Sequence, residues 1–246
     1  PNGNVQQDGH LVWDAERLFC EVKKGIAAAI AKCGKIDSLS IDTWAVDYVL
    51  MQGDKEIFPC YAYRDGRTER AVKEVHAILP FEKLYERTGI QFQPFNTVYQ
   101  LYADKLAGRL EKADGFLMLP EYLLYKLTGK RVCEYTNATS TGLVNAKTHT
   151  FDAEIISSLG LPARLFEKQI VQPGTAIGPL KKEVAAEVGG NMTAVLCATH
   201  DTASAVLAAP VASDFNSPYI SSGTWSLLGI EQETAHTDPD SMKENF

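Results

Sequence analysis

Three consecutive polar residues, His200, Asp201 and Thr202, offer groups that can exchange a proton with a substrate. They stand where an apolar strand at 193–198 is expected to meet an alanine-rich helix, and α/β sheets usually place ligands outside the carboxyl ends of strands. The positive end of the helix dipole favours an ionised Asp201, which suits a general base that accepts a proton from a substrate hydroxyl. The alternative is that Asp201 or Thr202 caps the helix, and the two roles do not exclude each other.

Two acids and a tryptophan interrupt a second expected strand, where Asp42, Trp44 and Asp47 lie close together. Proteins often hold a sugar ring against an aromatic face while polar groups bind its hydroxyls. In that interpretation Trp44 lines a sugar pocket rather than the hydrophobic core. The alternative is a twisted strand whose acids face solvent, and the sequence leaves both interpretations open.

Two further polar turns give weaker signals. The segment 221–224 (SSGT) contains small residues whose backbone N–H groups can approach phosphate oxygens closely, although the same residues also make an ordinary hairpin turn. No G-x-x-x-x-G-K-[ST] phosphate loop occurs in the chain. The segment 64–67 (RDGR) could hold a polar ligand, or it could form a turn in which Asp65 caps the following helix.

These polar segments must be positioned by helices and strands. Apolar residues that recur every four positions predict a helix from about Trp13 to Cys33, with Asp14 as its cap and Gly34 after its end. Further helices are expected at 67–79, from Asn96 to Leu110, from Pro120 to a stop at Gly129, and at 152–159. Strands are expected at 38–41, 46–51, 56–58, 193–198, 219–222 and 225–230. This order indicates an α/β chain, and a polar linker at 212–218 marks a candidate domain boundary.

Composition narrows the class of protein. The 246 residues carry a net charge of −7 with no basic arm to offset it, which argues against a duplex-binding protein on electrostatic grounds. Five cysteines lie far apart without a C-x-x-C pair, which favours reduced thiols and a cytoplasmic location over a disulfide framework or a zinc site. The longest apolar stretches are too short to cross a bilayer. An acidic globular enzyme or binding protein remains, with neither nucleic acid nor membrane as its expected partner.

Six segments of the chain, taken together and in this order, resemble the FGGY family of carbohydrate kinases. They are SIDTWAVD (residues 40–47), YRDGRT (63–68), GIQFQPFNT (89–97), EYTNAT (134–139), THDTASA (199–205) and SSGTWS (221–226). The run 89–97 and the block around Asp201 are the most specific of the six. Because the segments extend from residue 40 to residue 226, chance is a poor explanation. Within the family, the similarity is greatest to members that phosphorylate L-rhamnulose.

The resemblance implies an α/β fold of the ribonuclease H-like, actin-like ATPase type. It implies that residues 1–209 form the sugar-binding N-terminal domain without its first strands, and that residues 210–246 begin the nucleotide-binding C-terminal domain. Family members open with an Asp-x-Gly phosphate loop and carry an adenine pocket in their second half, and this sequence shows neither segment. We therefore interpret the chain as an internal piece of a kinase, incomplete at both ends and inactive on its own.

The resemblance also assigns residues to the sugar. Asp201 matches the family's catalytic base, which deprotonates the sugar hydroxyl that attacks the γ-phosphate of ATP. His200, Thr202 and Ala45 match positions that contact the sugar. Ala45 stands where L-rhamnulose kinases usually carry glycine, so its backbone is the expected contact. Tyr135 falls where related polyol kinases place an aromatic ring against their substrate.

On the nucleotide side, Thr224 matches a residue near the ATP phosphates, with Gly223 beside it. The implied cofactors are ATP and Mg²⁺, and the metal is expected mainly on the nucleotide phosphates rather than on protein ligands. The implied reaction is phosphoryl transfer to the terminal hydroxyl of a ketose, L-rhamnulose first. Two alternatives stay open: a family member that acts on xylulose, fuculose or glycerol, and a non-catalytic sugar-binding module of the same fold.

Overall fold

The structure is a computed structural model of the chain and describes residues 3–210, 217–223 and 226–246. The strands are β1 (Val5–Gln7), β2 (His10–Trp13), β3 (Ser38–Leu39), β4 (Tyr48–Gln52), β5 (Lys55–Ile57), β6 (Cys60–Tyr61), β7 (Gly115–Met118), β8 (Ala176–Pro179), β9 (Thr193–Val195), β10 (Tyr219–Ser222) and β11 (Ser226–Gly229). The α-helices are α1 (Ala15–Cys33), α2 (Glu69–Ile78), α3 (Phe81–Thr88), α4 (Thr97–Leu106), α5 (Leu119–Thr128), α6 (Tyr135–Thr139), α7 (Ala153–Ser158), α8 (Lys182–Val188), α9 (Asp201–Ala208) and α10 (Pro239–Lys243). Three short 3₁₀ helices are η1 (Gly66–Thr68), η2 (Arg109–Glu111) and η3 (Ala163–Phe166). The expected α/β class is confirmed, and no helix in the described part is long and apolar enough to cross a membrane.

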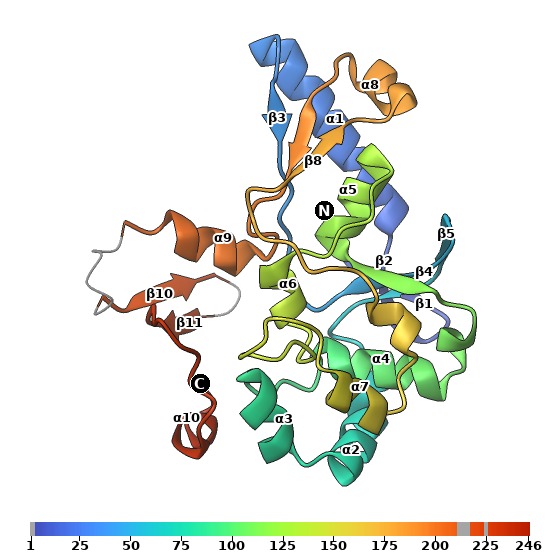
Figure 1. Cartoon of the computed structure of the whole chain (residues 1–246). Coiled ribbons are helices and arrows are strands. Elements are labelled where there is room, and N and C mark those ends of the chain that lie inside the picture. Colours follow the sequence, from blue (N-terminus) through green and yellow to red (C-terminus); the bar gives the residue numbers. More distant parts are fainter. Residues whose placement is uncertain (1–2, 211–216, 224–225) are drawn as a thin grey trace.

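An antiparallel sheet with the strand order β5-β4-β7 separates two hydrophobic cores. Side chains alternate across a strand, so Tyr48 and Leu50 of β4 face a core built with α2, α4 and α7. Val49 and Met51 face the opposite core, built with α1, α5 and α8. Figure 1 shows the first set of helices below this sheet and the second set above it. Because both faces are covered, β4 is an unbroken apolar run rather than an alternating one.

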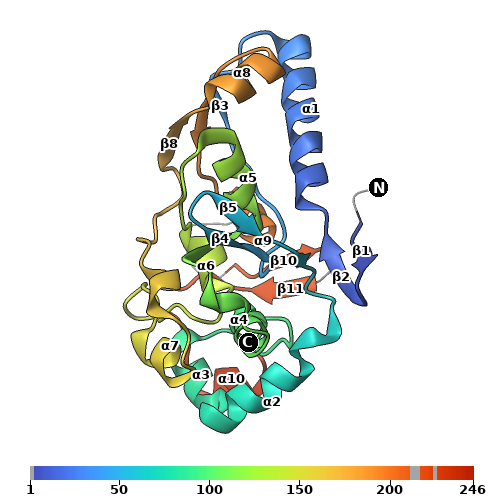
Figure 2. The same ribbon diagram turned by 90° about the vertical axis from the view of Figure 1, so that its right-hand side faces the viewer.

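A second sheet, with the strand order β3-β9-β8, carries the strand that leads to His200. The strands β3 and β9 pair in parallel, with Ser38 opposite Thr193, and β8 pairs with β9 in the antiparallel direction. Leu196 packs beside this sheet against Leu124 of α5. Figure 2 shows the long helix α1 running along this half of the molecule. The sheet thereby fixes the point at which the chain turns into α9.

The ends of two helices follow the local signals in the sequence. The side chain of Asp14 caps α1 by accepting a hydrogen bond from the Arg17 N–H, at 2.9 Å. Gly34 follows α1 with a φ of 74°, a conformation that glycine adopts without strain. Pro120 lies in the first turn of α5, and Gly129 ends that helix, also with a φ of 74°. Both predicted helices are confirmed.

One helix is shorter than predicted. The helix expected from Asn96 to Leu110 ends at Leu106, and Gly108 with a φ of 70° separates it from η2, which contains Leu110. The Asn96 side chain accepts a hydrogen bond from the Gln93 N–H at 2.8 Å and makes no capping bond to α4. Because a residue in the left-handed conformation cannot continue an α-helix, α4 ends before Gly108. The periodicity of the apolar residues alone therefore predicted too long a helix.

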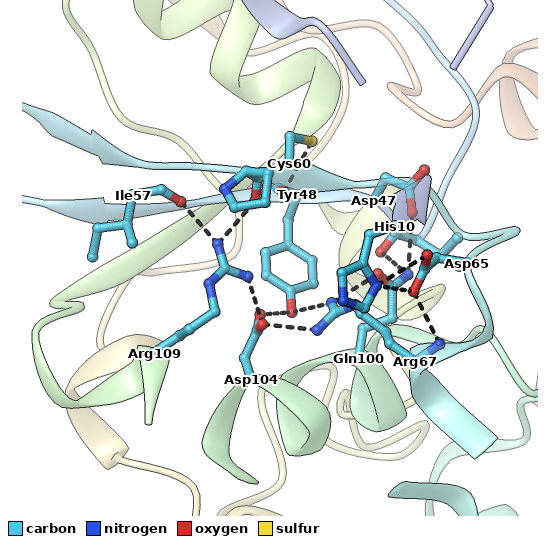
Figure 3. Close-up of polar contacts among 12 residues, drawn as sticks. His10, Asp47, Tyr48, Ile57, Cys60, Asp65, Arg67, Gln100, Asp104 and Arg109 are labelled. Carbon is cyan, nitrogen blue, oxygen red and sulfur yellow. Dashed lines mark hydrogen bonds and ion pairs between the residues drawn. The ribbon is translucent and has the colours of Figure 1, made fainter. Parts of the chain in front are cut away.

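The segment after Tyr63 forms the predicted turn. Asp65 accepts a hydrogen bond from the Arg67 N–H at 3.0 Å and caps η1. The Arg67 side chain turns inward to a cluster around Asp104, which lies 2.8 Å from Arg67 and 2.6 Å from Arg109 (Figure 3). Asp104 is fully buried, and both guanidinium groups are largely buried. The cluster ties α4 to η1 and η2.

A buried acid makes the stability of this fold depend on pH. Burial of Glu121 raises its pKa to about 8, although the N–H groups of Met118 and Glu134 that bond to it oppose the rise. A raised pKa in the folded state gives a contribution to stability that is present below pH 4.5 and is lost as the pH rises through 8. We therefore predict that the free energy of unfolding of Glu121→Gln, relative to that of the wild type, rises by about 1 kcal/mol or more from pH 5 to pH 9. Urea denaturation at both pH values measures this difference, and a difference independent of pH would contradict the prediction.

Candidate active site

A cleft of about 750 Å³ opens beside α6, α9 and the β10-β11 hairpin, which lie close together in Figure 1 and Figure 2. The volume lies within the range of small-molecule sites in proteins. The described residues that line it are Trp13, Trp44, Ala45, Val46, Tyr63, Gly89, Ile90, Gln91, Gln93, Phe95, Asn96, Thr139, Ser140, His200, Asp201, Thr202, Ser221, Gly223, Leu227 and Phe246. The fold thus brings together six of the residues that the sequence singled out, which are Trp44, Ala45, His200, Asp201, Thr202 and Gly223.

Backbone contacts hold Asp201 beside the segment that carries Trp44. The Thr43 N–H donates to the Thr199 carbonyl at 3.0 Å, and the Asp201 N–H donates to the Thr43 carbonyl at 2.8 Å. Thr43 also forms an isolated parallel bridge with His200. These contacts join two segments that are far apart in the sequence, so Trp44 and Asp201 reach the same cleft.

The carboxylate of Asp201 is accessible, with 56% of the side chain exposed. Its Oδ1 accepts a hydrogen bond from the Thr202 N–H at 2.7 Å. His200 occupies the cap position of α9 and makes no side-chain capping bond. Asp201 is thus the first residue of α9 rather than its cap residue, although its carboxylate does satisfy one N–H of the first turn. The carboxylate is left available to a ligand.

His200 adds a neutral hydrogen-bonding group next to this carboxylate. Its Nε2 lies 3.6 Å from Oδ1 of Asp201. Burial lowers the pKa of His200, and the nearby carboxylates of Asp201 and Glu134 oppose this shift only in part. The imidazole is therefore uncharged at pH 7, with one nitrogen that donates and one that accepts a hydrogen bond.

Four rings form an aromatic wall in the cleft: Trp13, Trp44, Tyr63 and Phe95. The ring centroids of Trp13 and Trp44 lie 4.3 Å apart, and those of Tyr63 and Phe95 lie 5.2 Å apart in an edge-to-face contact. Aromatic faces suit the C–H face of a sugar ring or chain. Trp44 lines the cleft and also packs partly against the core between α1 and α5, and its contact with a sugar stays a prediction.

The fully buried Asp47 lies behind the aromatic wall and orients it. Its Oδ2 accepts hydrogen bonds from the indole N–H groups of Trp13 (2.6 Å) and Trp44 (2.9 Å) and from the Tyr63 N–H (3.2 Å). Its Oδ1 accepts a bond from Gln100 at 3.1 Å. Burial raises the pKa of Asp47 to about 6, so the carboxyl group is mostly ionised at pH 7. Both sequence interpretations of Asp47 are wrong, because it neither faces solvent nor is open to a sugar.

The backbone at Val46 is held in a strained conformation at the edge of the cleft. Its φ of 67° is rare for a β-branched residue and persists only where neighbouring groups enforce it. The carbonyl of Val46 accepts bonds from the Thr97 hydroxyl (2.8 Å) and the Gln100 amide (3.2 Å), while the Asp47 N–H donates to the Ala45 carbonyl (2.9 Å). This tight turn sets the orientation of Ala45 in the cleft.

Two other segments supply polar groups that sequence analysis did not single out. Gln91, Gln93 and Asn96 precede α4, and Thr139 and Ser140 lie at the end of α6. Their amides and hydroxyls can bond the hydroxyls of a sugar that packs on the aromatic wall. Both segments belong to the motifs that carry the family resemblance, but nothing in the sequence marks these individual residues.

The structure does not bring Tyr135 to the cleft. Tyr135 begins α6, whereas the cleft is lined from the other end of that helix. Its ring lies 5.3 Å from the ring of His149 and packs against a small core that includes Cys133.

The β10-β11 hairpin supplies the side of the cleft that is expected to meet a nucleotide. Its strands pair from Tyr219 opposite Gly229 up to Ser222 opposite Ser226. Ser221 and Gly223 line the cleft, and a Cβ atom at Gly223 would have no other atom within 4 Å. The backbone at Gly223 is therefore open to a ligand. Thr224 lies outside the described residues.

The described residues fit part of what MgATP needs. The open backbone of Gly223 and the hydroxyl of Ser221 suit phosphate oxygens. Among the described residues that line the cleft there is no lysine or arginine. The described part of the chain also contains no group of three or more His, Cys, Asp or Glu side chains that could hold a metal ion.

Comparison with known families shows which family the chain belongs to. The N-terminal domain of the FGGY family of carbohydrate kinases matches residues 2–208. The chain belongs to this family. The described residues that line the cleft, from Trp13 to Thr202 in sequence order, all lie inside the matched range.

Individual relatives are similar over the whole chain. A rhamnulokinase from Oceanobacillus iheyensis is 44% identical over 248 residues, which cover 100% of this chain and 52% of the relative. A rhamnulokinase from Halalkalibacterium halodurans is 46% identical over 233 residues, which cover 94% of this chain and 49% of the relative. The chain thus spans about half the length of the curated relatives it matches.

Solved structures show that the fold is shared. A carbohydrate kinase from Novosphingobium aromaticivorans superimposes with a TM-score of 0.81 at 22% identity and covers 96% of this chain and 52% of its own. A gluconate kinase from Lactobacillus acidophilus gives a TM-score of 0.73 at 24% identity and covers 80% of this chain and 41% of its own. The predicted ribonuclease H-like fold of the FGGY kinases is confirmed.

Proposed function

We propose that the protein is an ATP-dependent kinase that phosphorylates the terminal hydroxyl of a ketose, with L-rhamnulose as its substrate. The observation that carries the proposal is the position of Asp201, an accessible carboxylate in a cleft that also holds the aromatic wall and the open backbone of Gly223. The choice of sugar is supported by relatives named rhamnulokinase that are 39–46% identical to this chain.

In the proposed reaction Asp201 accepts the proton of the terminal sugar hydroxyl. The sugar oxygen then forms a bond to the γ-phosphorus of ATP, and ADP leaves. Phosphoryl transfer depends on positioning and on charge neutralisation more than on covalent chemistry, so one well-placed base suffices. The neutral His200 and the adjacent Thr202 bond neighbouring hydroxyls, while the aromatic wall packs against the apolar face of the sugar.

The nucleotide meets the hairpin side of the cleft in this proposal. When bound, MgATP supplies the phosphoryl group, and its metal neutralises charge on the phosphate oxygens. The Gly223 backbone and the Ser221 hydroxyl approach the phosphates, and Thr224 keeps the role that the family resemblance implies. The same proposal includes a domain boundary near Ala209. It also includes a cytoplasmic location, which the free thiols of the five cysteines favour.

A substrate panel tests the proposed function. The full-length gene product is incubated with MgATP and with L-rhamnulose, D-xylulose, L-fuculose or glycerol, and ADP release is measured by a coupled assay. We expect kcat/KM to be highest for L-rhamnulose. A higher kcat/KM for another sugar would favour a different kinase of the family. Sugar binding by calorimetry without ADP release from any sugar would favour a non-catalytic sugar-binding module.

Tryptophan fluorescence reports on the aromatic wall. Because Trp13 and Trp44 both line the cleft and stack on each other, L-rhamnulose binding should change their emission. We predict that Trp13→Phe and Trp44→Phe each reduce the amplitude and that the double variant loses most of it. A full response in the double variant would place the sugar away from the aromatic wall.

A further inference from the structure

Another fully buried acid, Glu134, links the two sides of the cleft. It precedes α6 and caps that helix: its carboxylate accepts bonds from the Thr136 N–H (2.8 Å), the Thr136 hydroxyl (2.7 Å) and the Asn137 N–H (3.2 Å). The same carboxylate accepts the Thr199 N–H (3.0 Å) and the Thr199 hydroxyl (2.7 Å). Charge-assisted bonds of this kind are stronger than neutral ones, so Glu134 is a firm junction between α6 and the loop after β9.

The loop that Glu134 holds is the one that carries Asp201. Thr199 is fully buried two residues before Asp201, and its side chain is used entirely by Glu134. On its other side the loop is held by the backbone of Thr43. The residues between β9 and α9 are therefore clamped between Thr43 and Glu134.

The helix that Glu134 caps leads to the polar side of the cleft. Thr139 and Ser140 line the cleft at the end of α6, and their hydroxyls donate to the carbonyls of Thr136 and Asn137. A five-residue helix is short, so a fixed first turn fixes its last residues as well. One carboxylate thereby sets the position of Asp201 relative to Thr139 and Ser140.

We propose that Glu134 is a positioning residue for phosphoryl transfer, which holds the Asp201 loop against α6 and so sets where the Asp201 carboxylate meets the sugar hydroxyl. The inference rests on the proposed function of the cleft. A misplacement of about 1 Å in a catalytic group can cost roughly 100-fold in rate. Loss of the Thr199 contact should therefore lower kcat more than it changes the affinity for the sugar.

Two substitutions separate the two contacts of Glu134. In Glu134→Gln the amide NH₂ can take the place of Oε1, where it faces only the Thr136 N–H, while the amide oxygen keeps both bonds from Thr199. In Glu134→Asp the carboxylate still caps α6, but a side chain one methylene shorter no longer reaches Thr199. We expect kcat of the full-length gene product to fall about 10- to 100-fold in Glu134→Asp and to stay within threefold of the wild type in Glu134→Gln, with the KM for L-rhamnulose within threefold of the wild type in both variants.

The matched control is Asp152→Asn. Asp152 is also a buried acid at a helix start, where it caps α7 and pairs with Arg87, but it has no contact with the Asp201 loop. We expect this variant to lose stability while keeping the wild-type kcat.

A double variant tests whether Glu134 and Thr199 act through one contact. If they do, Thr199→Val should lower kcat as Glu134→Asp does. The variant that carries both substitutions should then be no slower than the slower of the two single variants.

Hydrogen exchange separates this inference from the proposed function. Amide exchange of the segment 196–205, measured by mass spectrometry, should be faster in Glu134→Asp than in the wild type and unchanged in Glu134→Gln and Asp152→Asn. Failure of the wild type to phosphorylate any sugar overturns the proposed function, while the exchange result still decides whether Glu134 holds the loop. Wild-type exchange in Glu134→Asp, or a kcat of that variant within twofold of the wild type, overturns the positioning role.

Discussion

Asp201→Asn should lower kcat for L-rhamnulose phosphorylation by the full-length gene product about 10²- to 10⁴-fold, the usual loss when a general base is removed. The amide keeps the size and the hydrogen-bond acceptor that meets the Thr202 N–H, but it cannot take a proton from the sugar. Sugar affinity should change little, because His200 and the aromatic wall remain. Steady-state kinetics together with calorimetric titration of the sugar measure both quantities.

The control for this prediction is Asp14→Asn. Asp14 is an acid at the start of another helix, where its side chain bonds the Arg17 N–H, and asparagine caps helices equally well. It does not line the cleft, so kcat should stay at the wild-type value. Activity of Asp201→Asn within threefold of the wild type would contradict its role as the base. A loss of stability without a loss of rate would assign Asp201 a structural role only.

Asp104→Asn should reduce the free energy of unfolding by about 3–5 kcal/mol, the typical cost of removing one partner of a buried ion pair. Asp104 is fully buried and is the common partner of Arg67 and Arg109, while the Tyr48 hydroxyl also donates to it (Figure 3). Asparagine would leave two largely buried guanidinium groups without their counter-charge. Urea denaturation of the variant and the wild type at pH 7 measures the loss.

The matched comparison is an exposed ion pair on a neighbouring helix. Arg70 and Glu74 pair at 2.6 Å on the surface of α2, where such pairs contribute about 0.3–0.5 kcal/mol. Glu74→Gln should therefore change the unfolding free energy by well under 1 kcal/mol. A similar, small effect of both substitutions would show that the cluster around Asp104 does not stabilise the fold as its burial implies.

Much of the framework could be predicted because its signals are local. The cap of α1 at Asp14, the glycines after α1 and α5, and the apolar run of β4 each act within a few residues of their element. The strand-to-helix junction at Asp201 was predicted for the same reason. The helix predicted from Asn96 to Leu110 was too long because the left-handed conformation of Gly108 ends it early.

The details of the site could not be predicted, because they depend on contacts between distant segments. The role of Asp47 is set by Trp13, Trp44, Tyr63 and Gln100, which come from four separate parts of the chain. No pattern around residue 47 shows that these donors converge on it. The positions of Tyr135 and of the cleft-lining end of α6 likewise follow from packing. The sequence motifs indicated which segments matter without indicating which side chains meet.

The most direct test of the account is a crystal structure of the full-length gene product with L-rhamnulose bound. The account predicts that the sugar lies in the cleft against Trp44 and the rest of the aromatic wall. Its terminal hydroxyl oxygen should lie within about 2.6–3.2 Å of the Asp201 carboxylate, the reach of a general base. A sugar bound outside this cleft, or bound in it with its terminal hydroxyl turned away from Asp201, would contradict the account.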